Sequence, residues 1–185
     1  MTATPFERIT DPDGRTIERI VLPTDEDFLL NLLRDLFETH WQEITYGPII
    51  QGAAFELRCA HAPKSITLHD GYLTVHFGRT HFHLCIGENT AALPALRQHR
   101  RTARAELFRG LDKTEAPITW GLRLFNGAGE QQMTVFFPNP FLSDDDGIRA
   151  TPDWSRLELW ETVCRCYAGL EPDGRDRTGE GFRRG

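Results

Sequence analysis

The sequence lacks any run of about 20 apolar residues, which is the length that a helix needs to cross a bilayer. Its first residues, Met1–Arg8, also lack the order of a signal peptide, in which a charged segment precedes an apolar one. We therefore expect a cytoplasmic protein that makes no contact with a membrane. The formal net charge of −6 disfavours a nucleic-acid-binding protein, so we expect no nucleic-acid partner either.

Cysteine is also scarce. The chain has four cysteines, Cys59, Cys85, Cys164 and Cys166, and no two of them have the C-x-x-C spacing of a zinc site. In the cytosol we expect free thiols or metal ligands rather than disulfides. Cys164 and Cys166 would point about 200° apart on a helix, so they cannot bind one ion together. An iron–sulfur cluster built from all four cysteines is therefore disfavoured.

The motifs of common enzyme classes are missing as well. The sequence shows no Ser-His-Asp arrangement, no paired-carboxylate motif and no P-loop. The segment Asn126–Glu130 is rich in glycine, but it lies between two expected strands, whereas a phosphate-binding loop precedes a helix. The sequence therefore leaves open whether the protein is an enzyme.

The 185 residues have an ordinary composition, with 39% hydrophobic and 26% charged residues, which is typical of one soluble globular domain. Hydrophobic periodicity predicts an α+β fold with a mainly antiparallel sheet of about six strands and helices packed on one sheet face. We expect this single domain to span residues 1–170. Residues 171–185 are rich in Gly, Arg and Asp, so we expect a flexible tail there.

Three segments have helical patterns. The first starts at a capping box formed by Thr24 and Asp27 and ends before Gly47-Pro48, with a continuous apolar stripe. The second is predicted over Ala92–Arg109, where Leu, Ala and Arg are frequent and Gly110 provides a stop. The third is expected to open at Pro152.

Strands are expected between these helices. A hairpin over residues 6–22 would turn at Asp11-Pro-Asp-Gly14. Residues 53–60 alternate in a way that predicts a strand with Phe55, Leu57 and Cys59 on the buried face. Further strands are expected at 65–86, 118–125 and 131–137.

The most informative segment is residues 65–86, which we predict to form three strands. Asp70-Gly71 between alternating residues is a strong hairpin signal, and this turn places Leu68 opposite Leu73. A second turn with Arg79-Thr80 at its tip would place His76 opposite His83. One face would then be entirely apolar, and the other would hold Ser65, Thr67, His69, Tyr72, Thr74, His76, His81, His83 and Cys85.

This second face carries imidazole, phenol and thiol groups and no charged side chains, which ordinary solvation of a sheet does not explain. His76, His81 and His83, with Cys85 as a fourth ligand, would lie close enough to bind one ion. Imidazole and thiolate suit zinc, copper or iron, so we predict a transition metal or metal-cofactor site on the 71–87 hairpin. Two alternatives stay open, namely a packed layer of structural histidines and a metal-free site for an anionic organic ligand.

Polar residues elsewhere are candidates for binding a small anionic ligand or the organic part of a cofactor. Arg100 lies in a row of arginines on the second predicted helix, close to its apolar stripe, and is expected to be partly buried and paired. Arg123 interrupts an apolar strand, and Glu130 stands at the exit of the adjoining turn. We predict Arg100, Arg123 and Glu130 as cofactor-binding residues, and we expect Glu130 with Gln131 and Gln132 to face the same pocket as the histidines. The alternative for the arginine row is a solvated helix face.

Several segments resemble those of an uncharacterised bacterial domain family, over roughly residues 45–182. They are Asp70–Val75 (DGYLTV), His81–Gly87 (HFHLCIG), Trp120–Gln132 (WGLRLFNGAGEQQ) and Phe137–Phe141 (FPNPF). That family has no established activity, so the resemblance implies no catalytic residues. His81-x-His-x-Cys85 also resembles a short pattern in an iron–sulfur domain attached to cobalt chelatases of tetrapyrrole synthesis. This resemblance keeps an iron cofactor, either an iron–sulfur cluster or haem, among the candidates.

Overall fold

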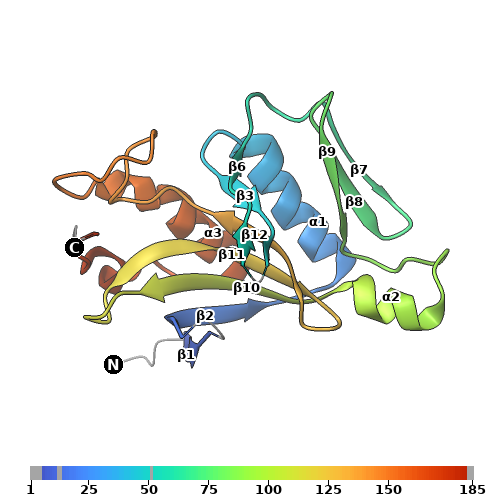
Figure 1. The fold of residues 1–185 in the computed structure, drawn as a ribbon, viewed down its shortest axis with the longest axis horizontal. Coiled ribbons are helices and arrows are strands. Elements are labelled where there is room, and N and C mark those ends of the chain that lie inside the picture. The colour runs from blue at the N-terminus through green and yellow to red at the C-terminus, as the bar shows by residue number, and fades with distance from the viewer. Residues whose placement is uncertain (1–5, 12–13, 51, 183–185) are drawn as a thin grey trace. The chain divides into compact units, whose positions relative to one another are not determined.

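A computed structural model describes residues 6–11, 14–50 and 52–182, and it confirms an α+β fold with a mainly antiparallel sheet (Figure 1). The helices are α1 (Glu26–Arg34), α2 (Pro94–Arg100) and α3 (Glu158–Ala168), with a π-helical turn at Asp35–Thr39 and 3-10 turns at Trp154–Leu157 and Gly174–Arg177. None of the helices in the described ranges has the length and apolar character needed to span a bilayer.

The strands form three sheets. Seven strands form the main sheet in the order β1-β2-β10-β11-β12-β3-β6, three form the sheet β7-β8-β9, and two form β4-β5. Their bounds are β1 Glu7–Thr10, β2 Thr16–Leu22, β3 Thr45–Gly47, β4 Ile49–Ile50, β5 Ala53–Ala54, β6 Leu57–Arg58, β7 Ser65–His69, β8 Tyr72–His76, β9 His81–Cys85, β10 Thr102–Leu111, β11 Pro117–Asn126 and β12 Gln131–Phe136. The predicted hairpins are all present, although residues 12 and 13 of the first turn lie outside the described residues.

The chain divides into two compact units that interleave along the sequence. The first unit comprises Met1–Ile20, Glu106–Leu122 and Phe136–Gly185, and the second comprises Val21–Ala105 and Arg123–Val135.

The core of the first unit is built on α3 and two tryptophans. Trp120 and Trp160 are fully buried, together with Leu157 and Val163 of the predicted helical stripe. The helix does not open at Pro152. Asp153 instead caps a 3-10 turn by accepting a hydrogen bond from the Ser155 amide, and α3 follows from Glu158.

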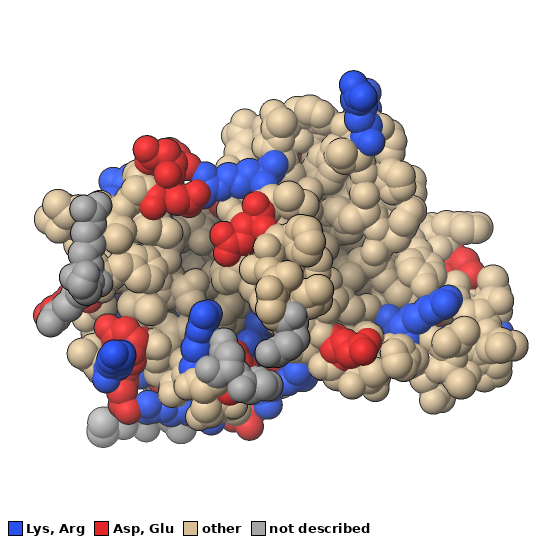
Figure 2. Space-filling model, viewed as in Figure 1, with Lys and Arg blue, Asp and Glu red and all other residues tan. Residues whose placement is uncertain are grey.

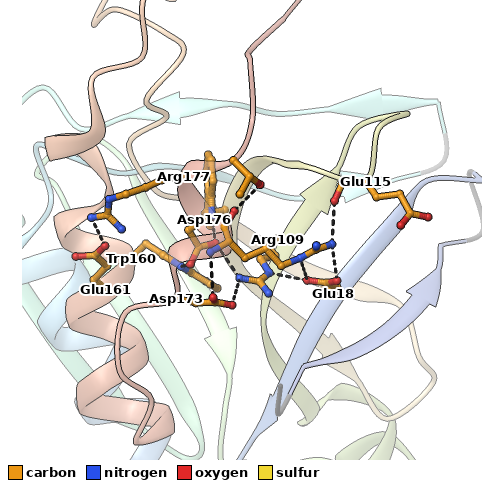
Figure 3. A network of polar contacts seen from close by, with 11 residues as sticks. Glu18, Arg109, Glu115, Trp160, Glu161, Asp173, Asp176 and Arg177 are labelled. Atoms are coloured by element: carbon orange, nitrogen blue, oxygen red, sulfur yellow. Dashed lines mark hydrogen bonds and ion pairs between the residues drawn. The ribbon is translucent and has the colours of Figure 1, made fainter. Parts of the chain in front are cut away.

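A buried ionic network connects three parts of this unit (Figure 3). Arg109 on β10 has 0% exposure, and its Nε donates to Glu18 Oε2 at 2.7 Å. Its Nη1 donates to Asp173 Oδ2 at 3.0 Å and to Asp176 Oδ1 at 3.1 Å. The Phe6 ring covers the guanidinium, with Cζ 4.2 Å from the ring centroid. Burial alone would lower the pKa of Arg109, but the carboxylates of Asp176 and Glu18 outweigh it and raise that pKa.

Asp176 anchors the segment after α3. The side chain is 2% exposed and also accepts hydrogen bonds from Trp120 Nε1 at 2.7 Å and Trp160 Nε1 at 3.0 Å. The composition of residues 171–185 predicts a flexible tail, and the structure differs at Gly174–Arg177, which forms a 3-10 turn next to buried partners. The polar residues that suggested mobility are the ones that pair with Arg109 and Glu18.

The second unit contains α1, which packs on the three-stranded sheet. Asp25, rather than the predicted Thr24, caps the helix by accepting a hydrogen bond from the Phe28 amide at 2.9 Å. The apolar face of β7–β9 is buried as predicted, with Leu73, Val75 and Ile86 at 0% exposure. The ring centroids of Phe37, in the turn after α1, and of Phe82 on β9 lie 5.2 Å apart. The Arg34 side chain at the end of α1 also donates to the Ile66 carbonyl of β7, so α1 and the turn after it lie against the small sheet (Figure 1).

The prediction of one helix over Ala92–Arg109 is wrong. The helix α2 ends at Arg100, and residues 102–111 form strand β10 instead. Local helix propensity is a weak preference, and here pairing within the main sheet overrides it. Arg100 is exposed, not partly buried, and Leu93 and Leu96 of the expected apolar stripe are 72% and 41% exposed. The predicted arginine row therefore does not exist as one helix face.

The segment 53–60 is also more broken than its alternation predicts. It forms the short strands β5 and β6, and Phe55 and Leu57 are 53% and 50% exposed instead of buried. Cys59 is half-buried and lies next to the Tyr46 hydroxyl. Burial raises the pKa of the Cys59 thiol, and the hydrogen bond with Tyr46 acts in the opposite direction.

Tyr46 gives a testable pH dependence. Burial, followed by the interaction with Cys59, raises the pKa of Tyr46 from 10.0 to about 12. The phenol therefore favours the folded state below pH 10, and this contribution is lost as the pH rises from 10 through about 12. We expect chemical denaturation to show a steeper alkaline loss of stability in the wild type than in Tyr46→Phe. Equal slopes for the two proteins in this pH range would contradict the assignment.

Candidate functional site

The candidate site is the polar face of β7–β9, on the side of this small sheet opposite to its buried apolar face. The side chains stand in three rows across the sheet. The rows are Ser65, His76 and His81, then Thr67, Thr74 and His83, then His69, Tyr72 and Cys85. The two faces are those predicted from the alternation, because side chains alternate along each strand.

The first turn has the predicted register, with Leu68 opposite Leu73. The second register is shifted by two residues, so His76 lies opposite His81 and not His83. The loop occupies Phe77–Thr80, closed by a hydrogen bond from the Phe77 amide to the Thr80 carbonyl at 2.8 Å, with Gly78 at a φ of 100°. A shift of two preserves which face each residue occupies and changes only its neighbours.

The three imidazoles lie next to one another in two adjacent rows. The ring centroids of His81 and His83 lie 5.0 Å apart, and those of His76 and His81 lie 6.0 Å apart. Two imidazoles that bind one ion with metal–nitrogen distances of about 2.0–2.1 Å and a tetrahedral angle have ring centres about 5 Å apart. The spacing of His81 and His83 therefore suits two ligands of one ion.

Thr74 orients the His83 ring. Its Oγ1 lies 2.7 Å from His83 Nδ1 across the β8–β9 pair. When Nδ1 carries the hydrogen and donates it to Thr74, the lone pair of Nε2 is left for a metal. Thr74 was predicted to lie on this face but not to take part in the site. The register of the second turn, in which Thr74 opposes His83, is the signal that identifies it.

Cys85 differs from the histidines. It is 4% exposed, and its Sγ lies 3.7 Å from the Gly87 carbonyl oxygen, to which it donates. Burial raises the pKa of the Cys85 thiol, although the Tyr72 hydroxyl and the charges of Arg100 and Arg101 act in the opposite direction. Burial of this kind makes a thiol a poorer metal ligand than an exposed one, because the thiolate is the form that binds metals.

The described part of the chain contains no group of three His, Cys, Asp or Glu side chains already arranged around a common metal position. The predicted four-residue site of His76, His81, His83 and Cys85 is therefore not preformed. The four cysteines also differ in exposure. Cys85 and Cys164 are buried, Cys59 is half-buried and Cys166 is exposed. What the structure offers is a set of accessible imidazoles on a rigid strand pair.

Arg100 and Arg101 stand near the Cys85 end of this face. Gln132 Nε2 donates to the Arg100 carbonyl at 2.8 Å, and its Oε1 accepts from Thr102 Oγ1 at 2.8 Å. Thr102 Oγ1 also lies 3.0 Å from the Cys85 carbonyl oxygen. These contacts fix the backbone of residues 100–102 to the end of β9.

The other two predicted ligand-binding residues have different surroundings. Arg123 is buried, with its guanidinium carbon 5.5 Å from the centroid of the Phe125 ring. Glu130 is exposed, accepts a hydrogen bond from Asn126 at 2.9 Å and pairs with His99 at 3.5 Å. The Asn126 hydrogen bond is the main cause that holds the pKa of Glu130 below its ordinary value. Both side chains are thus accounted for by local contacts.

The surface around the small sheet is low in charge. Figure 2 shows few Lys, Arg, Asp or Glu side chains over the region of β7–β9. The nine side chains of the polar face include no charged type. Imidazole is therefore the dominant polar chemistry that this face presents to a ligand.

Comparison with known proteins places the chain in a family and shows a fold likeness. A chain described as "Crystal structure of ChuX" is similar in structure, with a TM-score of 0.52 and 13% sequence identity. The match covers 82% of this chain and 78% of that one, and at this identity it shows likeness of fold alone. The sequence matched no curated protein. Residues 6–169 match the model described as "Family of unknown function (DUF7676)", and the chain therefore belongs to that family.

Proposed function

We propose that this protein binds a transition metal, either as an ion or as the metal of a cofactor such as haem, through His81 and His83, with His76 as a neighbouring third ligand. The observation that carries the proposal is the 5.0 Å spacing of the His81 and His83 ring centroids. The 2.7 Å contact between Thr74 Oγ1 and His83 Nδ1 supports it, because it orients one ring for binding through Nε2.

The donor set narrows the class of metal site. Imidazole suits zinc, copper and iron, and neither the acidic side chains favoured by calcium and magnesium nor an accessible thiolate belongs to this face. Since Cys85 is buried and its thiol donates to the Gly87 carbonyl, the histidines supply two or three ligands and leave other coordination positions open. Open positions are typical of catalytic metals and of cofactor-bound metals, and less so of structural zinc.

The test compares metal affinity in matched histidine variants, using protein purified without a metal-affinity tag. We expect His83→Ala to weaken binding of added zinc by at least about tenfold, the loss that is typical even for removing a group that only orients a ligand. His69→Ala is the control, because His69 lies on the same face but in the row with Tyr72 and Cys85, away from His81. Competition titration with a zinc-sensitive dye measures the zinc affinity of both variants.

The same variants separate this function from a structural role. If His83→Ala leaves both zinc and haem affinity unchanged, the histidines are a polar layer of the sheet and the proposal fails. Thr74→Val adds a second check, because it removes only the oriented hydrogen bond. We expect it to weaken zinc binding less than His83→Ala does, while leaving the fold intact as measured by circular dichroism.

A further inference from the structure

We propose, building on the proposed function, that the ligand is an anionic metal complex that carries carboxylate groups. Its metal would lie at His81 and His83, and its carboxylates would lie at Arg100 and Arg101, beyond the Cys85 end of the same face. Four features of the second unit carry this inference.

The first feature is that both arginines lack an acidic partner within the described ranges of the chain. Neighbouring Arg97, by contrast, approaches Glu88 Oε1 at 3.8 Å and donates to the Thr90 and Ala92 carbonyls. Arg100 is exposed and Arg101 is half-buried, so an incoming anion can reach both. Arginine binds carboxylates through two parallel hydrogen bonds, which makes such a pair a suitable anchor.

The second feature is the fixed position of the pair relative to the histidines. The hydrogen bonds of Gln132 and Thr102 hold residues 100–102 against the end of β9. His83 and His81 precede Cys85 along β9, so their Cα atoms lie about 7 Å and about 14 Å from that of Cys85. A ligand of modest organic size can therefore span metal and anion positions.

The third feature is an apolar border at the same place. Leu96 and Arg100 are four residues apart on α2 and so share one side of the helix. Leu96 is 41% exposed, and Leu93 at the start of α2 is 72% exposed, with no residue of α2 buried. Two exposed leucines near the arginines suit a ligand that is apolar in its body and anionic at its edge.

The fourth feature is the open coordination of the metal position. Two or three imidazoles on a flat sheet leave several positions of the metal without a protein ligand. A complex that brings its own donor atoms fills these positions. A bare ion would have to keep water there.

The test uses haem as the probe complex, haem dimethyl ester as the probe with its carboxylates blocked, and zinc ion alone. We expect the double variant Arg100→Ala/Arg101→Ala to weaken haem binding by about three- to tenfold, the range of two partly exposed ion pairs. Zinc affinity and ester affinity should stay unchanged. Arg79→Ala is the matched control, because Arg79 is exposed in the loop at the opposite end of β9. Absorption titration measures haem and ester binding.

The outcomes separate the two proposals. Equal haem affinity in the double variant and the wild type, or equal affinity for haem and its ester, would overturn the inference and leave metal binding by the histidines intact. Both proposals would be overturned if the arginine variant bound haem more weakly while His83→Ala bound zinc and haem as tightly as the wild type. The protein would then have only an anion site. Both proposals are supported if haem binding weakens in His83→Ala and in Arg100→Ala/Arg101→Ala, while the arginine variant binds the ester as tightly as the wild type.

Discussion

Replacing Arg109 by methionine is expected to lower the free energy of unfolding by about 3–5 kcal/mol, the loss that follows when one partner of a buried ion pair is removed. Arg109 is fully buried and donates to three carboxylates, those of Glu18, Asp173 and Asp176. Methionine fills much of the same volume, so the effect isolates the lost charge. Asp176 would keep its two tryptophan donors but would lose the cation that balances its charge.

Urea denaturation of the wild type, Arg109→Met and Arg8→Met measures this effect. Arg8 provides the control, because its 2.5 Å ion pair with Glu115 is 45% and 61% exposed at the two side chains. An exposed pair of this kind contributes little to stability, because water and salt screen it. A loss below about 1 kcal/mol in Arg109→Met would show that the three carboxylates find other compensation, and the assigned role of the network would be wrong.

A second variant serves if Arg109→Met does not fold. Arg109→Lys keeps the positive charge but cannot make the Nε contact to Glu18 and the Nη1 contacts to Asp173 and Asp176 together. We expect a stability between those of the wild type and Arg109→Met. Stability equal to that of the wild type would mean that charge alone, and not the forked geometry, stabilises this core.

The candidate face could be predicted because its signals are local. Asp70-Gly71 takes the turn conformation expected of it, with φ values of 46° and 77°, and strict alternation then assigns every side chain from Ser65 to Cys85 to a face. The partner of each histidine was less predictable. The second turn has Gly78-Arg79 at its tip instead of the predicted Arg79-Thr80, and this shift of one residue in the turn moves each partner by two residues.

Other errors came from contacts between distant parts of the sequence. Leu, Ala and Arg over residues 102–109 favour a helix locally, but burial of Ala105, Leu107 and Phe108 in a sheet strand decides the outcome. Arg109 and Asp176 lie 67 residues apart, so no local pattern could show that they pair. The composition of the tail pointed to mobility because charged residues usually face water, and their buried partners become visible only in the fold.

The turn that starts the histidine hairpin gives the other large effect, in Gly71→Ala. Gly71 has a φ of 77°, and a Cβ atom there would lie 2.7 Å from backbone atoms of Gly87 and Glu88. The Gly71 carbonyl also accepts hydrogen bonds from the Ile86 and Gly87 amides at 2.9 Å, so the two backbones cannot separate without losing them. We expect a loss of about 2–4 kcal/mol from the left-handed conformation and the contact together.

Gly129→Ala isolates the contact from the conformation. Gly129 has a similar φ of 79°, in the turn between β11 and β12, but nothing lies within 4 Å of a Cβ placed there. It should cost only the conformational part, about 1–2 kcal/mol. Urea denaturation of the two variants gives the difference directly. Equal losses would mean that the chain after β9 moves away freely from Gly71, and that the close contact with Gly87 and Glu88 adds nothing to the cost.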